Sequence, residues 1–204
     1  GHVIPAYNLA NQFIYENKFK VEIILDKRGL KYLKSSNKIK VTKIASATIF
    51  NKNILEIFYS IMIILYSTFK SLFFLLFNRP NLVFGMGGYS SFPVCVAAKL
   101  LRIPFIIYEN NLIIGKANKY LMPFAKKIFV SSRELEGVSE RYKKKICEIG
   151  NIISKEIINY RNINNSILKN KKLKILVLGG SQAAKIFAEK LTGIFEACAN
   201  TKIP

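Results

Sequence analysis

The chain has 204 residues, half of them hydrophobic, and carries 32 Lys plus Arg against 12 Asp plus Glu. This composition supplies a sizeable core and excludes a disordered or low-complexity protein. The chain has one histidine, which excludes a histidine-based metal site. Its three cysteines lie far apart, which argues against a thiolate metal site and a disulfide framework. With one histidine and one aspartate, a Ser-His-Asp triad is also disfavoured. We expect no metal, no cofactor and a reduced cytoplasmic setting.

The hydrophobic pattern predicts strands that alternate with helices, as in a parallel α/β sheet with right-handed crossovers. In chain order we expect a helix at 3–15, strands at 20–25 and 39–45, a long apolar segment at 54–77, a strand at 81–84, a helix at 92–101, a strand at 104–108, a helix at 115–124, and strands at 127–131 and 145–149.

The amino-acid composition changes near Gly150. Residues 154–172 are polar and rich in Asn and Lys, and an apolar run at 173–178 then leads into Gly179-Gly180-Ser181-Gln182 and a helix from about Ala183. We therefore expect a first Rossmann-like domain at 1–155, a linker at 156–172 and the beginning of a second Rossmann-like domain at 173–204. Because the sequence opens at Gly1-His2 and stops after an expected helix, we treat it as a fragment.

The apolar segment 54–77 is long enough to cross a bilayer. Glu56, Lys70 and several serines interrupt it, and it leads directly into a sheet strand, which argues against a span. A core helix and a helix that docks on an anionic membrane both remain open. The net charge of +20 selects no partner, since a lysine-rich composition bias explains it as well.

Glycine turns occur where strands lead into helices, and such turns present backbone N–H groups to phosphates. Five segments resemble, in order, motifs of the MurG family of bacterial cell-wall glycosyltransferases. They are Gly1-His2-Val3-Ile4-Pro5, Gly85-Met86-Gly87-Gly88-Tyr89-Ser90-Ser91-Phe92-Pro93, Tyr108-Glu109-Asn110-Asn111 with Gly115 and Asn118-Lys119, Gly150-Asn151, and Gly179-Gly180-Ser181-Gln182-Ala183-Ala184.

The resemblance implies a GT-B fold, with two Rossmann-like domains facing across a cleft. It also implies an inverting hexosyltransferase on the cytoplasmic face of the inner membrane, acting in peptidoglycan synthesis. The enzyme would move N-acetylglucosamine from UDP-N-acetylglucosamine onto lipid I, undecaprenyl-pyrophosphoryl-N-acetylmuramyl-pentapeptide. The fragment alone is expected to be inactive.

The resemblance also implies site residues. His2 matches the candidate general base, with Glu109 as a second base candidate or an orienting carboxylate. Contacts to the sugar-nucleotide donor are implied for Gly1, Asn111, Ser181 and Gln182, and the acceptor diphosphate would lie on Gly87, Gly88, Tyr89 and Ser90. For His2 the alternative is a residue that only shapes its loop, and for Glu109 it is a plain surface glutamate.

The sequence departs from the family pattern at several positions. Tyr108 replaces a histidine, Ser154 an arginine and Ala183 a glycine. Two other functions stay open: another GT-B transferase acting on a lipid-linked sugar, and a basic membrane-associated binding module without activity. A nucleic-acid-binding module fits less well, because lysine greatly outnumbers arginine and most aromatics lie in apolar runs.

Overall fold

The computed structural model describes residues 2–16, 19–33, 39–48, 53–160, 189–191 and 193–196. The chain separates into two compact units, residues 1–161 and 162–204. In the second unit the described residues are helical. The strand expected at 173–178 and the glycine turn with Ser181 and Gln182 lie outside the described residues, as does Gly1.

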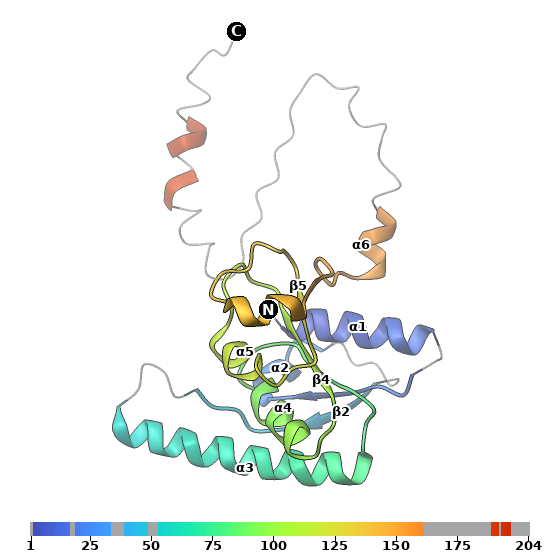
Figure 1. The fold of residues 1–204 in the computed structure, drawn as a ribbon. Helices are drawn as coiled ribbons and strands as arrows, with labels where there is room; N and C mark the ends of the chain where they lie inside the picture. Colours follow the sequence, from blue (N-terminus) through green and yellow to red (C-terminus); the bar gives the residue numbers. More distant parts are fainter. Residues whose placement is uncertain are drawn as a thin grey trace. The chain divides into compact units, whose positions relative to one another are not determined.

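The first unit is built from parallel strands and helices (Figure 1), which confirms the predicted α/β class. Its elements are α1 (Val3–Tyr15), β1 (Glu22–Leu25), α2 (Lys27–Leu30), β2 (Lys40–Lys43), α3 (Ile54–Asn78), β3 (Val83–Gly85), α4 (Ser91–Leu100), β4 (Phe105–Glu109), α5 (Lys116–Leu121), β5 (Lys127–Val130), a 3-10 helix η1 (Glu140–Lys145), β6 (Ile146–Glu148) and α6 (Lys155–Tyr160).

The described strands form two parallel sheets. β1 pairs with β2, with Leu25 opposite Lys43, while β3, β4, β5 and β6 pair in sequence order. The central strands of the larger sheet bury one face fully, since Ile107 in β4 and its register partner Ile128 in β5 are both 0% exposed. On the other face, Tyr108 of β4 is 1% exposed. Such continuous apolar runs are typical of parallel sheets covered by helices.

Three short helices were not predicted, and one predicted helix is shorter than expected. α2 and η1 span only four and six residues, too few for a helical hydrophobic period to show. α6 occupies the first residues of the segment expected to be a linker. α5 ends at Leu121, two residues before Pro123, although the prediction ran to 124.

Asp26, the one aspartate of the chain, connects the end of β1 to the segment that follows β2. Its Oδ1 accepts the Gly29 backbone N–H at 2.9 Å and caps α2, while its Oδ2 accepts from Arg28 at 2.7 Å and from Ser46 at 2.6 Å. Burial raises the pKa of this carboxyl, but the hydrogen bonds from Ser46 and Arg28 outweigh it and hold the pKa below its ordinary value. The ionised carboxylate thereby holds Ser46 at the end of β1.

Small side chains let α4 lie close to the sheet and to α3. Cys95, Ala97 and Ala98 are all 0% exposed and belong to the main hydrophobic core, together with Leu75 of α3 and Phe105 of β4. Burial raises the pKa of Cys95 to about 12, so its thiol stays neutral and acts as a small apolar side chain.

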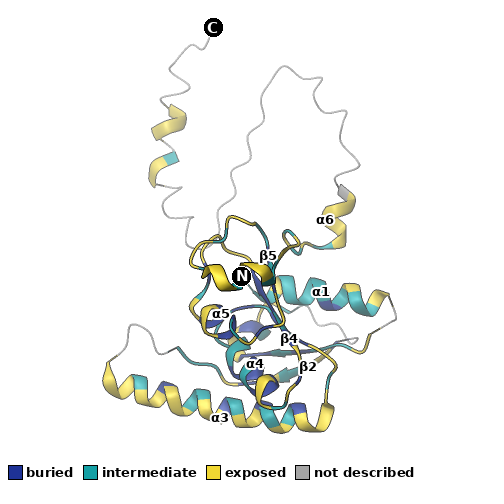
Figure 2. Cartoon of the chain, viewed as in Figure 1, coloured by how far each residue is buried: buried dark blue, intermediate teal, exposed yellow. Residues whose placement is uncertain are grey.

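Helix α3 turns serines inward and apolar side chains outward. Ser60, Ser67 and Ser71 are at most 2% exposed, and Ser67 Oγ donates to the Ala45 carbonyl at 2.8 Å. On the opposite side, one face carries Phe58, Met62, Leu65, Phe69, Phe73 and Leu76, which are between 44% and 63% exposed. We call these six residues the outer face of α3; Figure 2 shows the helix exposed along most of its length.

The inverted pattern gives a test of the packing. Ser67→Leu should destabilise the first unit by about 1–3 kcal/mol, because the larger side chain overfills the contact and leaves the Ala45 carbonyl without its donor. Phe69→Ser, at a position that is 63% exposed, should change stability by no more than about 0.5 kcal/mol. Urea unfolding of both variants measures this. A larger loss for Phe69→Ser than for Ser67→Leu would mean that the two faces are assigned the wrong way round.

Candidate functional site

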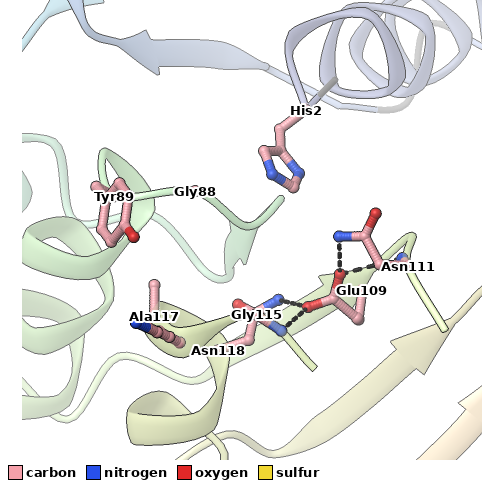
Figure 3. A pocket seen from close by; sticks show the side chains of 9 residues that line it. His2, Gly88, Tyr89, Glu109, Asn111, Gly115, Ala117 and Asn118 are labelled. Carbon is pink, nitrogen blue, oxygen red and sulfur yellow. Dashed lines mark hydrogen bonds between the residues drawn. The ribbon is translucent and has the colours of Figure 1, made fainter. Parts of the chain in front are cut away.

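A pocket lies beyond the carboxyl ends of β3 and β4, where parallel sheets place their ligand sites. It has an empty volume of about 400 Å³, part of it open to solvent. Residues from four places in the chain line it (Figure 3): His2 before α1, the glycine loop before α4, the end of β4, and the loop and first turn of α5. They are His2, Gly88, Tyr89, Glu109, Asn111, Gly115, Lys116, Ala117 and Asn118.

The imidazole of His2 lies directly against two glycines of the loop after β3. A Cβ atom placed on Gly87 would come within 2.9 Å of His2 Nδ1, and one on Gly88 would come within 3.2 Å of Cδ2. Both glycines also have positive φ angles, +86° and +74°, which favour glycine. Glycine is therefore favoured at both positions for two reasons: the backbone has a positive φ angle, and a Cβ atom would crowd the His2 imidazole.

His2 is partly buried in this position, and its protonation follows from that. Burial is the largest cause that lowers the pKa of His2 below its ordinary value of 6.5, and the positive charge of the N-terminus lowers it further, while the nearby Glu109 carboxylate and a backbone hydrogen bond at Met86 act in the opposite direction. The imidazole is consequently neutral near pH 7 and can accept a proton.

The glycine loop leads into the N-terminus of α4. Ser90 is the N-cap residue, but its side chain makes no capping hydrogen bond, while Ser91 Oγ donates to the Gly88 carbonyl at 2.9 Å. The glycine loop and Tyr89 therefore lie at the N-terminus of α4, where the N–H groups of the first helical turn and the positive end of the helix dipole are found. This arrangement suits a phosphate or diphosphate.

Glu109 is 1% exposed, and both of its carboxylate oxygens are occupied by donors. Oε1 accepts the Asn111 backbone N–H at 3.1 Å and the Asn111 Nδ2 at 2.9 Å. Oε2 accepts the Gly115 backbone N–H at 2.8 Å and the Asn118 Nδ2 at 3.0 Å. These four hydrogen bonds fold residues 110–118 around the carboxylate and point Asn111 into the pocket (Figure 3).

Asn118 is a pocket residue to which the sequence interpretation assigned no role. It is 1% exposed, its Nδ2 donates to the Tyr108 carbonyl and to Glu109, and its Oδ1 has no hydrogen-bond partner among the described residues. A buried amide oxygen without a donor is costly, so a ligand hydroxyl or amide in the pocket would satisfy it. The signal in the sequence was an asparagine at a buried helical position, where that residue is uncommon.

Of the predicted site residues, the structure brings His2, Gly88, Tyr89, Glu109 and Asn111 into one pocket. Gly87 lies against the His2 imidazole, and Ser90 occupies the N-cap position of α4 without a capping hydrogen bond from its side chain. The donor contacts expected at Gly1, Ser181 and Gln182 fall outside the described residues. No group of three or more His, Cys, Asp or Glu that could hold a metal ion occurs in the described part of the chain.

Tyr108, where the sequence departs from the MurG pattern, is not among the residues that line this pocket, and it connects β4 to the segment after β6. Its hydroxyl lies 3.1 Å from both the Gly150 carbonyl and Asn110 Oδ1, and it accepts the Ile152 N–H at 3.4 Å. The replacement of the family histidine by Tyr108 therefore affects the contact between the end of β4 and the segment after β6.

Comparisons with known proteins identify relatives of this chain. The model of the glycosyltransferase family 28 N-terminal domain matches residues 1–130. An N-acetylglucosamine transferase of Pelagibacter ubique, named for the N-acetylmuramyl-(pentapeptide) pyrophosphoryl-undecaprenol on which it acts, is 32% identical over 100% of this chain and 55% of its own length. The enzyme of the same name from Rickettsia canadensis is 34% identical over 93% of this chain and 51% of its own length.

Among solved structures, MurG of Acinetobacter baumannii superposes with a TM-score of 0.71 and 25% sequence identity, over 100% of this chain and 55% of that one. This likeness confirms the predicted GT-B type of fold. The chain spans about half the length of the curated relatives it matches. On the strength of the domain match, the chain belongs to glycosyltransferase family 28.

Proposed function

We propose that the protein carrying this chain transfers N-acetylglucosamine from UDP-N-acetylglucosamine to lipid I, and that this chain supplies the acceptor side of the site. The observation that carries the proposal is the pocket itself. It sets a neutral, partly buried imidazole, a glycine loop at a helix N-terminus and a fixed asparagine around one space. The relatives' names supply the identities of the two substrates.

In the proposed reaction the C4 hydroxyl of the muramyl sugar attacks the anomeric carbon of N-acetylglucosamine, and UDP leaves with inversion. His2 takes the hydroxyl proton, since its lowered pKa leaves it unprotonated at neutral pH. The acceptor diphosphate lies at Gly87–Ser90 and the N-terminus of α4, where backbone N–H groups and the helix dipole favour its charge. Asn111 contacts the donor.

The geometry favours a positioning role for Glu109 over a role as base. Its carboxylate already accepts four hydrogen bonds, so no lone pair with good geometry is left for a substrate hydroxyl. Holding Asn111 and Asn118 in place is a sufficient reason for a glutamate at this position. Asn118 Oδ1 is a further contact for a sugar hydroxyl.

Of the two other functions, only the binding module fits the pocket less well. A binding module without activity gives no reason for an imidazole held in the neutral form against a glycine loop. A transferase for a different lipid-linked sugar shares every feature of the pocket and differs only in substrate. Adding a different lipid-linked sugar as a competing acceptor to the assay below separates that second function from the proposed one.

Transfer of labelled N-acetylglucosamine from UDP-N-acetylglucosamine to a lipid I analogue, by the complete gene product, tests the proposal. Activity should fall as the pH is lowered through the pKa of His2, which lies below 6.5, because the protonated imidazole cannot accept a proton. His2→Gln should reduce the rate by about 100-fold or more and remove this acidic limb.

Glu109→Gln is the matched comparison. A positioning glutamate predicts a lower rate with the acidic limb still present, because the base is intact. If Glu109→Gln removes the limb and His2→Gln keeps it, the two roles are exchanged. If the folded wild-type protein transfers nothing to the lipid I analogue, the proposed function is wrong.

We further propose that the protein is peripheral at the cytoplasmic face of the inner membrane and docks there through the outer face of α3. α3 is long and apolar enough to cross a bilayer, yet Ser60, Ser67, Ser71 and Leu75 are buried along one side of it, which suits docking from the opposite side. The six exposed apolar residues lie on one face of the helix and form a continuous apolar patch, unlike apolar residues scattered singly over a surface. Lys70 on the same helix adds attraction to anionic lipid.

Flotation with preformed anionic vesicles measures the docking. The double substitution Phe69→Glu with Phe73→Glu should weaken vesicle binding by about 100-fold or more, since both side chains lose their place in the apolar layer. Ile157→Glu with Ile158→Glu changes two exposed apolar residues on α6 instead and should leave binding unchanged. Equal losses in the two double variants would contradict docking through α3.

A further inference from the structure

A second, apolar pocket adjoins the candidate site on the side of α3. It has an empty volume of about 380 Å³, part of it open to solvent, and its walls are almost entirely apolar. Its lining comes from the segment after β2, from α3, α4 and α5, and from the glycine loop, and includes Ala47, Ile64, Tyr89, Phe92, Ala117 and Tyr120. No residue discussed as a base, donor contact or diphosphate contact lies in it except Tyr89.

The two pockets share a wall. Tyr89, Lys116 and Ala117 line both of them. Lys116 has an apolar stem and a cationic end, so one side chain suits an apolar group on one side and a phosphate on the other. A ligand that joins a diphosphate to an apolar chain would therefore meet matching surfaces in both pockets without a break.

The far side of the apolar pocket continues onto the outside of the molecule. Ile64 belongs to α3, and Ile61, one helical turn before it, is 40% exposed. Tyr120 on the opposite wall is 61% exposed. The pocket thus lies between the candidate diphosphate site and the apolar surface of α3.

The walls of this pocket are held in place by hydrogen bonds outside it. Ser67 Oγ donates to the Ala45 carbonyl at 2.8 Å, and Ser46 Oγ donates to Asp26 Oδ2 at 2.6 Å. Ala47 follows Ala45 and Ser46 directly in the chain, so the part of the pocket wall that it forms is held in place by contacts with both the end of β1 and α3. A preformed apolar pocket of this kind binds an apolar group without first having to order its own walls.

We propose that this apolar pocket binds the first isoprene units of the acceptor's polyprenyl chain, next to the diphosphate. The inference rests on the proposed function, which supplies an acceptor with a diphosphate joined to a polyprenyl chain. The pocket then distinguishes prenyl from non-prenyl acceptors within the protein itself, separately from any docking on a membrane. The remainder of the chain leaves along α3 toward the bilayer.

Steady-state transfer by the complete gene product, in solution without vesicles, tests this with two soluble acceptors. Both carry the same muramyl diphosphate headgroup; one bears a farnesyl chain and the other a methyl group. The farnesyl acceptor should have a KM lower by about tenfold or more, since at least one five-carbon unit leaves water. Ala47→Phe fills the pocket and should abolish this difference while leaving the KM of the methyl acceptor unchanged.

Ala45→Phe is the matched control, because it adds the same bulk two residues away at an exposed position outside the pocket, and it should keep the difference. Ile64→Ala, which enlarges the pocket, provides a second variant if Ala47→Phe does not fold, and should reduce the difference by about threefold. Equal KM values for the two acceptors in the wild type, or an equal rise for both in Ala47→Phe, would overturn the subsite. Failure to transfer to either acceptor would instead count against the proposed function.

Discussion

At the carboxyl end of β4 a charged side chain is almost completely removed from water. The Glu109 carboxylate accepts hydrogen bonds from Asn111, Gly115 and Asn118, and the segment between β4 and α5 takes its shape from these bonds. A buried carboxylate is tolerated only when such donors surround it. Since the donors come from the loop and from the start of α5, the same interaction also sets where α5 begins and which residues face the pocket.

The other half of the pocket depends on space rather than on charge. Two glycines with positive φ angles leave room for the His2 imidazole, and the glycine loop then enters α4, whose first-turn N–H groups have no side-chain cap. In the proposed function the neutral imidazole and this helix end form the acceptor side of the site. The domain match by itself assigns the chain to glycosyltransferase family 28.

Much of this could be predicted from the sequence, and the reasons for the rest are physical. The strand-turn-helix order and the glycine loop were visible because apolar runs and glycines mark them. The role of Glu109 was left open, since two of its four donors are backbone N–H groups whose positions follow from the folded loop. Whether residues 54–77 form a core helix or a docking helix was also left open, because apolar residues surround the helix. Only the packing against α4 shows that the serines, not the phenylalanines, face inward.

His2 is the one histidine of the chain, so its imidazole can be followed alone by NMR during a pH titration. If the glycine loop holds this imidazole out of water, its pKa lies below 6.5. Gly87→Ala places a Cβ within 2.9 Å of Nδ1 and should expel the ring and return its pKa toward 6.5, whereas Gly150→Ala, with a similar φ of +75° but open space around it, should leave the pKa unchanged. A wild-type pKa at or above 6.5, or one that Gly87→Ala does not alter, would contradict the account.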